Sequence, residues 1–221
     1  QRAKSVEFSV NYGGSEVTIK NNNNIPLEEA KKIYDNYMKG FPGIKDYQDK
    51  QRKFVSDNDF IILNDKLREK AFIYDYSEMQ AIKASFTQSF WEDYKKIPRN
   101  NLGKKVARDE KEKKMVDLVH QYFKRKSSAE KQAIDYKCQG TGSAMFKSAC
   151  MFLWNYLIKN NLVFKVKFVI PAHDEINIEV PDELTEQLTK VLQDCMMRAG
   201  RLFCANIDFP AEAEVGTCWI H

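Results

Sequence analysis

The stretch VIPAHDEINIEV, residues 169–180, places three polar side chains between two runs of strand-forming residues. Ile and Val favour strands, so the sequence predicts a β-hairpin with His173, Asp174 and Glu175 at its turn. Turn chemistry readily explains one Asp, but two adjacent carboxylates repel each other unless a cation lies between them. Mg²⁺ accepts one or two protein carboxylates plus waters and substrate phosphates. The turn is therefore a candidate half of a magnesium site, and a polar turn without a ligand is the alternative.

The composition bounds the class of protein. The chain has 221 residues, is 43% hydrophobic and 30% charged, and carries a net charge of +4, which suits one large globular domain or two small ones. The odd number of cysteines and the lack of a CxxC pair suggest neither a disulfide framework nor a zinc site. A reducing cytoplasm fits best. We expect neither a membrane span nor a signal peptide, because the longest apolar run is short and is broken by Asn155.

Periodicity and helix-breaking residues predict a mainly helical chain with strands in a few places. The expected helices cover 1–12, 26–39, 44–56, 78–96, 115–124, 143–159 and 182–198. The expected strands are a pair around Asn64-Asp65, residues 162–172 and 176–180, and a short strand near the end in 211–221. The four asparagines 21–24 and the FPG triplet 41–43 are expected to be loops.

The segment 95–114 differs from the rest of the chain in charge. It contains nine Lys or Arg residues against three Asp or Glu and has few apolar residues. A solvated insertion or exposed helix explains this composition. A surface that contacts phosphates explains it as well, because Lys and Arg bind nucleic acid by releasing counterions.

Five segments together resemble sequence motifs of the family A, polymerase-I-like DNA polymerases, in the order of that family. VIPAHDEINIEV resembles motif C, in which HDE lies between two palm strands. KSVEFSVNYG has the motif B spacing K-x3-F-x3-Y-G, carried by Lys4, Phe8, Tyr12 and Gly13. The other three are YMKGFPGIKDY (37–47), CQGTGSAMFKSA (138–149) and the terminal EVGTCWIH (214–221). Residues 75–130 match poorly and look like an insertion. The compact, divergent motifs suggest a phage-like origin.

The resemblance implies an α+β fold, with a helical fingers portion plus half of a palm in which helices flank an antiparallel sheet. It divides the chain into three parts. Residues 1–56 would be partial fingers, with the motif B helix and the helices after it. Residues 57–130 would hold the strand pair and the basic helical insertion, and residues 131–221 would be the palm portion with the motif C hairpin.

The resemblance also implies a nucleotide pocket lined by the motif B helix. Lys4 matches the lysine that contacts the triphosphate, where an ammonium neutralises charge that builds up during phosphoryl transfer. Phe8 matches the position near the sugar, and Tyr12 matches the tyrosine that borders the templating base pair. Gly13 would allow close approach of the backbone to the template. A surface lysine and ordinary core aromatics are the structural alternatives.

The second group of implied site residues lies near motif C. Asp174 matches the carboxylate that holds two Mg²⁺ ions, and Glu175 matches an auxiliary carboxylate. His173 matches a histidine near the primer terminus. Gln139 matches a glutamine that reaches the minor groove of the primer–template, where acceptors occur on every base pair. With Lys4, the two carboxylates are the candidate catalytic residues.

The sequence departs from the family pattern where motif A should supply a second metal-holding aspartate. We therefore expect this chain alone to be inactive and to work with an upstream segment or a complementary N-terminal polymerase chain. The stretch IYDYSEMQ (73–80) looks like motif A, which makes Asp75 a candidate, and an Asp-Tyr-Ser turn after a strand is its structural alternative. The arginine that precedes the motif B lysine is also missing, and Arg2 is a weak substitute.

The predicted function is template-directed addition of deoxynucleoside triphosphates to a primer 3′-OH, in the cytoplasm of a bacterium or of a phage-infected cell. Two alternatives remain at this point. A single-subunit RNA polymerase shares the lysine and YG spacing, but there we would expect Ser in place of Glu175 and no Phe8. A catalytically silent remnant that binds primer–template DNA would use the basic segment and Gln139 equally well.

Overall fold

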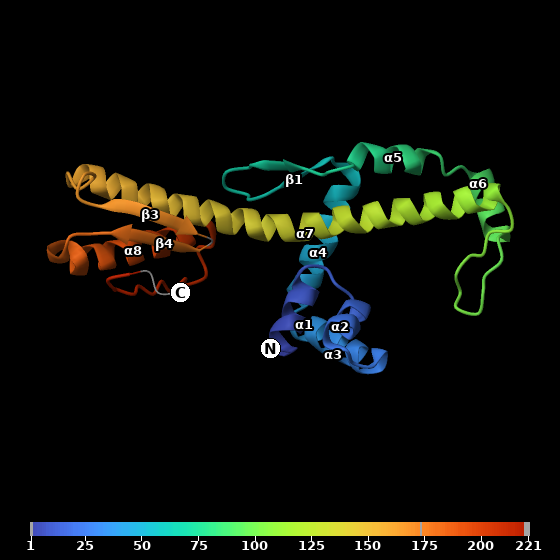
Figure 1. The fold of residues 1–221 in the computed structure, drawn as a ribbon. Helices are drawn as coiled ribbons and strands as arrows, with labels where there is room; N and C mark the ends of the chain where they lie inside the picture. Colours follow the sequence, from blue (N-terminus) through green and yellow to red (C-terminus); the bar gives the residue numbers. More distant parts are fainter. Residues whose placement is uncertain (1, 173, 219–221) are drawn as a thin grey trace. The chain divides into compact units, whose positions relative to one another are not determined.

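The computed structural model describes residues 2–172 and 174–218, which form mostly helices with two small antiparallel hairpins (Figure 1). The chain divides into two compact units. The first unit contains residues 1–63 and 69–137, and the second contains residues 64–68 and 138–221. Within the described residues, no helix carries an apolar segment of the length needed to cross a bilayer.

The first unit opens with four helices that follow one another after short breaks. They are α1 (Arg2–Asn11), α2 (Glu16–Asn23), α3 (Leu27–Gly40) and α4 (Pro42–Asp57). Val10, Ile19 and Ala30 form a shared core between the first three helices. The expected helix ends at Gly13 and Gly40 are confirmed to within two residues, because glycine accepts the backbone conformations that stop a helix.

Two expected loops in this region are helical. Asparagines 21–23 belong to α2, and only Asn24, with φ of 50°, adopts the left-handed conformation that ends it. Ser15 and Thr18 form a capping box at the start of α2, and the side chain of Asn23 donates a hydrogen bond to the carbonyl of Ile19 at 3.0 Å. These local bonds offset the low helix propensity of asparagine. Pro42 likewise lies inside α4, where its first-turn position costs no hydrogen bond.

The rest of the first unit contains a strand pair, two short helices and the beginning of a long helix. Strands β1 (Phe60–Ile62) and β2 (Lys70–Phe72) pair antiparallel as predicted. The single helix expected over 78–96 is wrong, because α5 (Tyr76–Ala84) and α6 (Gln88–Lys96) are separate. Thr87 causes the break, since its side chain caps α6 by accepting from the Phe90 amide at 3.2 Å.

Helix α7 (Glu110–Lys159) is one continuous helix of 50 residues. We expected two separate helices, 115–124 and 143–159, from the patterns of those two segments. The correction has a simple cause: the intervening segment contains no proline, and glycine weakens a helix by only about 1 kcal/mol. The first part of α7 belongs to the first unit and the remainder to the second.

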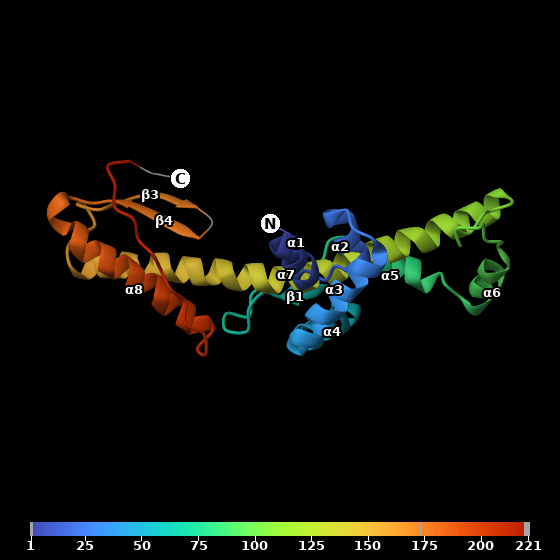
Figure 2. The same cartoon turned by 90° about the horizontal axis from the view of Figure 1, so that it is seen from below.

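The second unit packs a hairpin on two helices. Strands β3 (Lys167–Ala172) and β4 (Glu175–Glu179) pair antiparallel, and the short 3-10 turn η1 (Asp182–Leu184) leads into α8 (Thr185–Phe203). Figure 2 shows the hairpin as a layer over the end of α7 and α8. The predicted hairpin is confirmed, although β3 begins at residue 167 rather than 162. The strand expected near the chain end is absent from the described residues 211–218, and 219–221 lie outside them.

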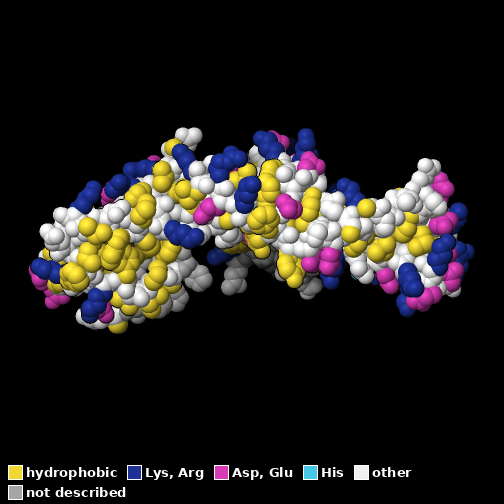
Figure 3. Space-filling model, turned by 90° about the horizontal axis from the view of Figure 1, so that it is seen from above, with side chains coloured by type: hydrophobic (Ala, Val, Ile, Leu, Met, Phe, Trp, Pro, Cys, Tyr) yellow, Lys and Arg dark blue, Asp and Glu magenta, His cyan; other side chains and the backbone are white. Residues whose placement is uncertain are grey.

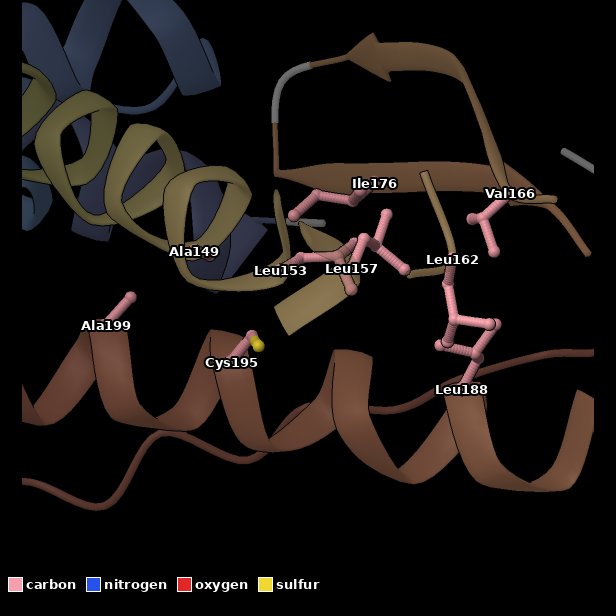
Figure 4. Close-up of a cluster of buried hydrophobic side chains, with 9 residues drawn as sticks. All are labelled: Ala149, Leu153, Leu157, Leu162, Val166, Ile176, Leu188, Cys195 and Ala199. Atoms are coloured by element: carbon pink, nitrogen blue, oxygen red, sulfur yellow. The ribbon is translucent and has the colours of Figure 1, made fainter. Parts of the chain in front are cut away.

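Buried apolar side chains from the hairpin and both helices form the core of this unit (Figure 4). Leu153 and Leu157 of α7 lie opposite Leu188 of α8, and Ile176 of β4 closes the cluster from the hairpin side. The alternation along β4 explains this, because Ile176 faces the helices whereas its neighbour Glu175 faces solvent. The core therefore determines which face the hairpin turns outward.

Candidate functional site

The predicted nucleotide-binding residues Lys4 and Phe8 lie along one face of α1, and Tyr12 directly follows its last residue. The Lys4 ammonium is 5.8 Å from the centre of the Phe8 ring, and the Phe8 and Tyr12 rings stack with centroids 5.8 Å apart. Their spacing of four residues brings them over one another on a helix. Lys4 is exposed and 48% of Phe8 is exposed, so this face is not part of a core. It presents a cation beside an aromatic surface, which suits an anionic ligand that also carries a ring.

The opposite face of α1 is fixed to the rest of the first unit. Val10 is completely buried, and its carbonyl accepts a 2.7 Å hydrogen bond from the buried Gln48 side chain of α4. The Tyr37 hydroxyl of α3 donates to the side chain of Asn11 at 3.2 Å. A helix held from two neighbours in this way keeps its exposed face at a constant orientation. Sequence reasoning missed Gln48, because one glutamine in a helix carries no signal of burial.

Gly13 is required at the end of α1 for two reasons. Its φ of +77° lies in the left-handed region that favours glycine. A Cβ atom added there would also lie 2.8 Å from Cδ1 of Ile134 on α7. The main chain after Tyr12 therefore packs closely on α7.

Gly13→Ala should destabilise the first unit by about 2 kcal/mol, because alanine at positive φ and a steric conflict each have a cost. The comparison is Gly43→Ala in α4, where an added Cβ meets nothing within 4 Å and alanine favours the helix. Urea denaturation of both variants measures the difference. A Gly13→Ala variant as stable as the unchanged chain would show that neither constraint is real.

The two predicted metal-binding carboxylates lie at the tip of the β3–β4 hairpin. Asp174 is in the turn, and Glu175 is the first residue of β4, opposite Ala172. Both are exposed, so the turn does not point into the apolar core beneath it. His173, the third residue of the predicted triplet, lies outside the described residues.

The hairpin tip fits a magnesium ion in part. Two exposed carboxylates match the protein share that Mg²⁺ accepts when waters and phosphates complete its shell. In the described part of the chain, no group of three or more His, Cys, Asp or Glu side chains could hold a metal ion. The tip therefore offers part of a coordination shell rather than a closed metal cage.

Gln139 is an exposed residue of α7, in the part of that helix with which the second unit begins. The structure thus groups the predicted site residues into a stacked face on α1, a carboxylate pair on the β3–β4 hairpin and a glutamine on α7.

Asp75, the candidate from the motif-A-like stretch, takes part in an ion-pair cluster. Its carboxylate lies 2.7 Å from Arg125 of α7, and the same guanidinium contacts Glu78 at 2.6 Å. Asp75 also has a φ of 60° where the chain turns into α5. These contacts join α5 to α7 within the first unit, and they favour the structural alternative over a metal ligand.

Comparison with solved structures identifies the class of fold. The polymerase domain of Pol1 from M. smegmatis, solved in complex with DNA primer-template and dNTP, superposes with a TM-score of 0.62 at 17% sequence identity. The match covers 90% of this chain and 27% of that one. The fold is therefore that of a portion of a DNA polymerase I polymerase domain.

Sequence comparison gives the family. The family model of DNA polymerase family A matches residues 1–221, so this chain belongs to DNA polymerase family A. DNA polymerase I of Streptococcus pneumoniae is 24% identical over 219 residues, and that of Caldicellulosiruptor bescii is 24% identical over 218. Each match covers 99% of this chain, which spans about a fifth of the length of these relatives. The predicted family is confirmed.

Proposed function

We propose that this chain forms part of the nucleotide-adding site of a template-directed DNA polymerase, which extends a primer 3′-OH with deoxynucleoside triphosphates. The observation that carries the proposal is the exposed stacked face of α1 in a chain of this family. Lys4 would bind the triphosphate, because an ammonium stabilises phosphate charge as the bond to the leaving group breaks. Phe8 would lie against the sugar, and Tyr12 and Gly13 would border the templating base pair.

The β3–β4 hairpin would supply the metal-binding carboxylates of the polymerase. Asp174 and Glu175 would hold Mg²⁺, which activates the primer hydroxyl and neutralises the leaving pyrophosphate when bound. His173 would position the primer terminus. Gln139 would contact minor-groove acceptors of the primer–template, which every base pair presents.

We further propose that the second metal-holding carboxylate comes from a segment outside these residues, either upstream in a longer protein or on a complementary chain. Two features support this. The hairpin tip presents two carboxylates, which is part of a two-metal clamp, and Asp75 is already bound to Arg125. A separate segment would complete the clamp from the opposite side.

Primer extension tests the proposal. The purified chain is assayed with primer–template, dNTPs and Mg²⁺, alone and mixed with the region that precedes the matched segment in the Streptococcus pneumoniae relative. We expect no extension by the chain alone and Mg²⁺-dependent extension by the mixture. Strong synthesis by the chain alone would refute the need for a second segment. DNA binding without extension in either sample would favour the alternative of a binding chain without chemistry.

A further inference from the structure

Residues 98–106, between α6 and α7, form a closed turn that we call the basic hairpin. The amide of Val106 donates to the carbonyl of Pro98 at 2.8 Å, and the amide of Asn100 donates to the carbonyl of Lys104 at 2.9 Å. The hairpin extends from the body of the first unit as a loop (Figure 1). These paired backbone groups give the hairpin a defined shape. Its composition alone would also allow a solvated segment without such bonds.

The tip of the basic hairpin is fixed by one asparagine. The side-chain oxygen of Asn100 accepts hydrogen bonds from the amides of Leu102 and Lys104, both at 3.0 Å. Gly103 has a φ of +73°, and its carbonyl accepts a hydrogen bond from the Arg99 guanidinium. The residues 100–103, Asn-Asn-Leu-Gly, are typical of a turn, although the prediction for this segment rested on its charge alone.

Charge near the basic hairpin is only partly neutralised. Asp93 of α6 binds Lys96 at 3.0 Å and Lys111 at 3.2 Å, and these two lysines hold the pKa of Asp93 below its usual value. Figure 3 shows basic and acidic side chains mixed at this end of the first unit. In the part of the chain that the structure describes, however, Arg99 and Lys104 form no ion pair with a carboxylate, and both are exposed. The hairpin itself therefore carries two cations that no carboxylate of the described residues neutralises.

An apolar residue, Leu102, lies between these two cations in the sequence. Leu102 is 80% exposed at the tip, held there by the bonds of Asn100. Leu102 belongs to neither buried cluster of the first unit, so its side chain is available to a partner. Apolar wedges of this kind enter the minor groove at a base step in proteins that bend DNA, with basic residues on the phosphates.

We propose that the basic hairpin binds the minor groove of duplex DNA, with Arg99 and Lys104 on backbone phosphates and Leu102 wedged against a base step. The proposal rests on the proposed function, which makes a primer–template duplex the partner. A single strand fits less well, because single-strand binding uses aromatic side chains on which bases stack, and the tip carries none. The basic hairpin would give the protein a second contact with the duplex. It lies within residues 75–130, the segment that matches the family motifs poorly.

The salt dependence of duplex binding tests the phosphate contacts. Affinity of the whole chain for a fluorescein-labelled primer–template is measured by anisotropy over a range of monovalent salt. Arg99→Gln with Lys104→Gln should flatten the slope of log affinity against log salt by about 1.8, because each phosphate contact contributes about 0.9. At 0.1 M salt this equals a loss of affinity of about 60-fold. The control, Lys31→Gln with Lys32→Gln, removes two exposed charges from α3 and should leave the slope unchanged.

Two more variants separate contact from folding. Lys104→Gln alone, which removes no hydrogen bond made by the Lys104 side chain in the described structure, should flatten the slope by about 0.9. Leu102→Ser should keep the wild-type slope. With 2-aminopurine placed in the duplex, the unchanged chain should raise the fluorescence as bases unstack, and Leu102→Ser should abolish that rise.

The outcomes distinguish this proposal from the proposed function. If the unchanged chain binds the duplex and the hairpin variants keep its slope, or the Lys31/Lys32 control loses as much, the basic hairpin is not a DNA contact while the polymerase proposal stands. If the hairpin variants lose binding but primer extension with the complementary segment never occurs, the polymerase proposal fails instead. An unchanged chain that binds no duplex at low salt would overturn both.

Discussion

Replacing Asp174 with Asn should lower the rate of nucleotide addition by at least about 10³-fold, the upper range for removal of one preorganised electrostatic group. Asn keeps the shape of the side chain but loses the charge that would hold Mg²⁺. Because Asp174 is exposed in the turn, the substitution leaves the core under the hairpin intact. The measurement is single-turnover primer extension by the chain together with its complementary segment.

Glu179→Gln is the matched control for Asp174→Asn. Glu179 is also an exposed carboxylate of the β3–β4 hairpin, and it forms a 3.1 Å ion pair with Lys167. Exposed ion pairs contribute little to stability, so this variant should extend primers at the unchanged rate. Duplex affinity should be the same for both variants. Equal losses in the two variants would mean that general charge on the hairpin, and not a metal ligand, governs the reaction.

The elements that the sequence predicted well are those that local chemistry determines. Gly13 ends α1 because its backbone needs positive φ, and Asn64-Asp65 separates two short β-forming runs. The β3–β4 hairpin has alternating side chains on either side of a polar turn. In each case the signal lies within a few residues, so it can be recognised without knowing the tertiary contacts.

The predictions that were wrong concern elements that depend on hydrogen bonds from side chains or, for α7, on the packing of a very long helix. Asparagines 21–23 remain helical because Ser15 caps the helix from six residues upstream. Thr87 interrupts a segment whose apolar pattern continues across it. The continuity of α7 has no local signal either. Its two ends pack into the cores of the two units, and this packing supports the polar segment between them as helix.

For the candidate site, the motif spacing placed Lys4, Phe8 and Tyr12 on one face, and the hairpin pattern placed the carboxylates at its tip. The sequence did not reveal what holds these groups. The anchor of α1 comes from Gln48, far along the chain, and the ion pair of Asp75 comes from a residue 50 positions later. Such contacts form between elements distant in sequence, and no single-sequence pattern encodes them.

The β3–β4 hairpin depends on the core beneath it for its stability. A two-stranded sheet is at best marginally stable in water, so the tip that carries Asp174 can keep its shape only if the hairpin is packed on helices. Leu157 of α7 is fully buried in that core, together with Ile176 of the hairpin and Leu188 of α8. One buried leucine thus links the stability of the second unit to the geometry of the candidate metal site.

Leu157→Ala should therefore destabilise the second unit by about 3 kcal/mol, because it removes buried methyl groups and leaves a cavity. The neighbouring Ile158 is 51% exposed, and Ile158→Ala should change stability by less than about 0.5 kcal/mol. Urea denaturation measures the loss, and hydrogen exchange at the amides of β3 and β4 shows whether the hairpin opens with it. If those amides stay protected in Leu157→Ala while the unit is destabilised, the hairpin has another source of order. If protection falls, primer extension should fall with it although Asp174 is unchanged, because a carboxylate can hold a metal ion only on a turn of fixed shape.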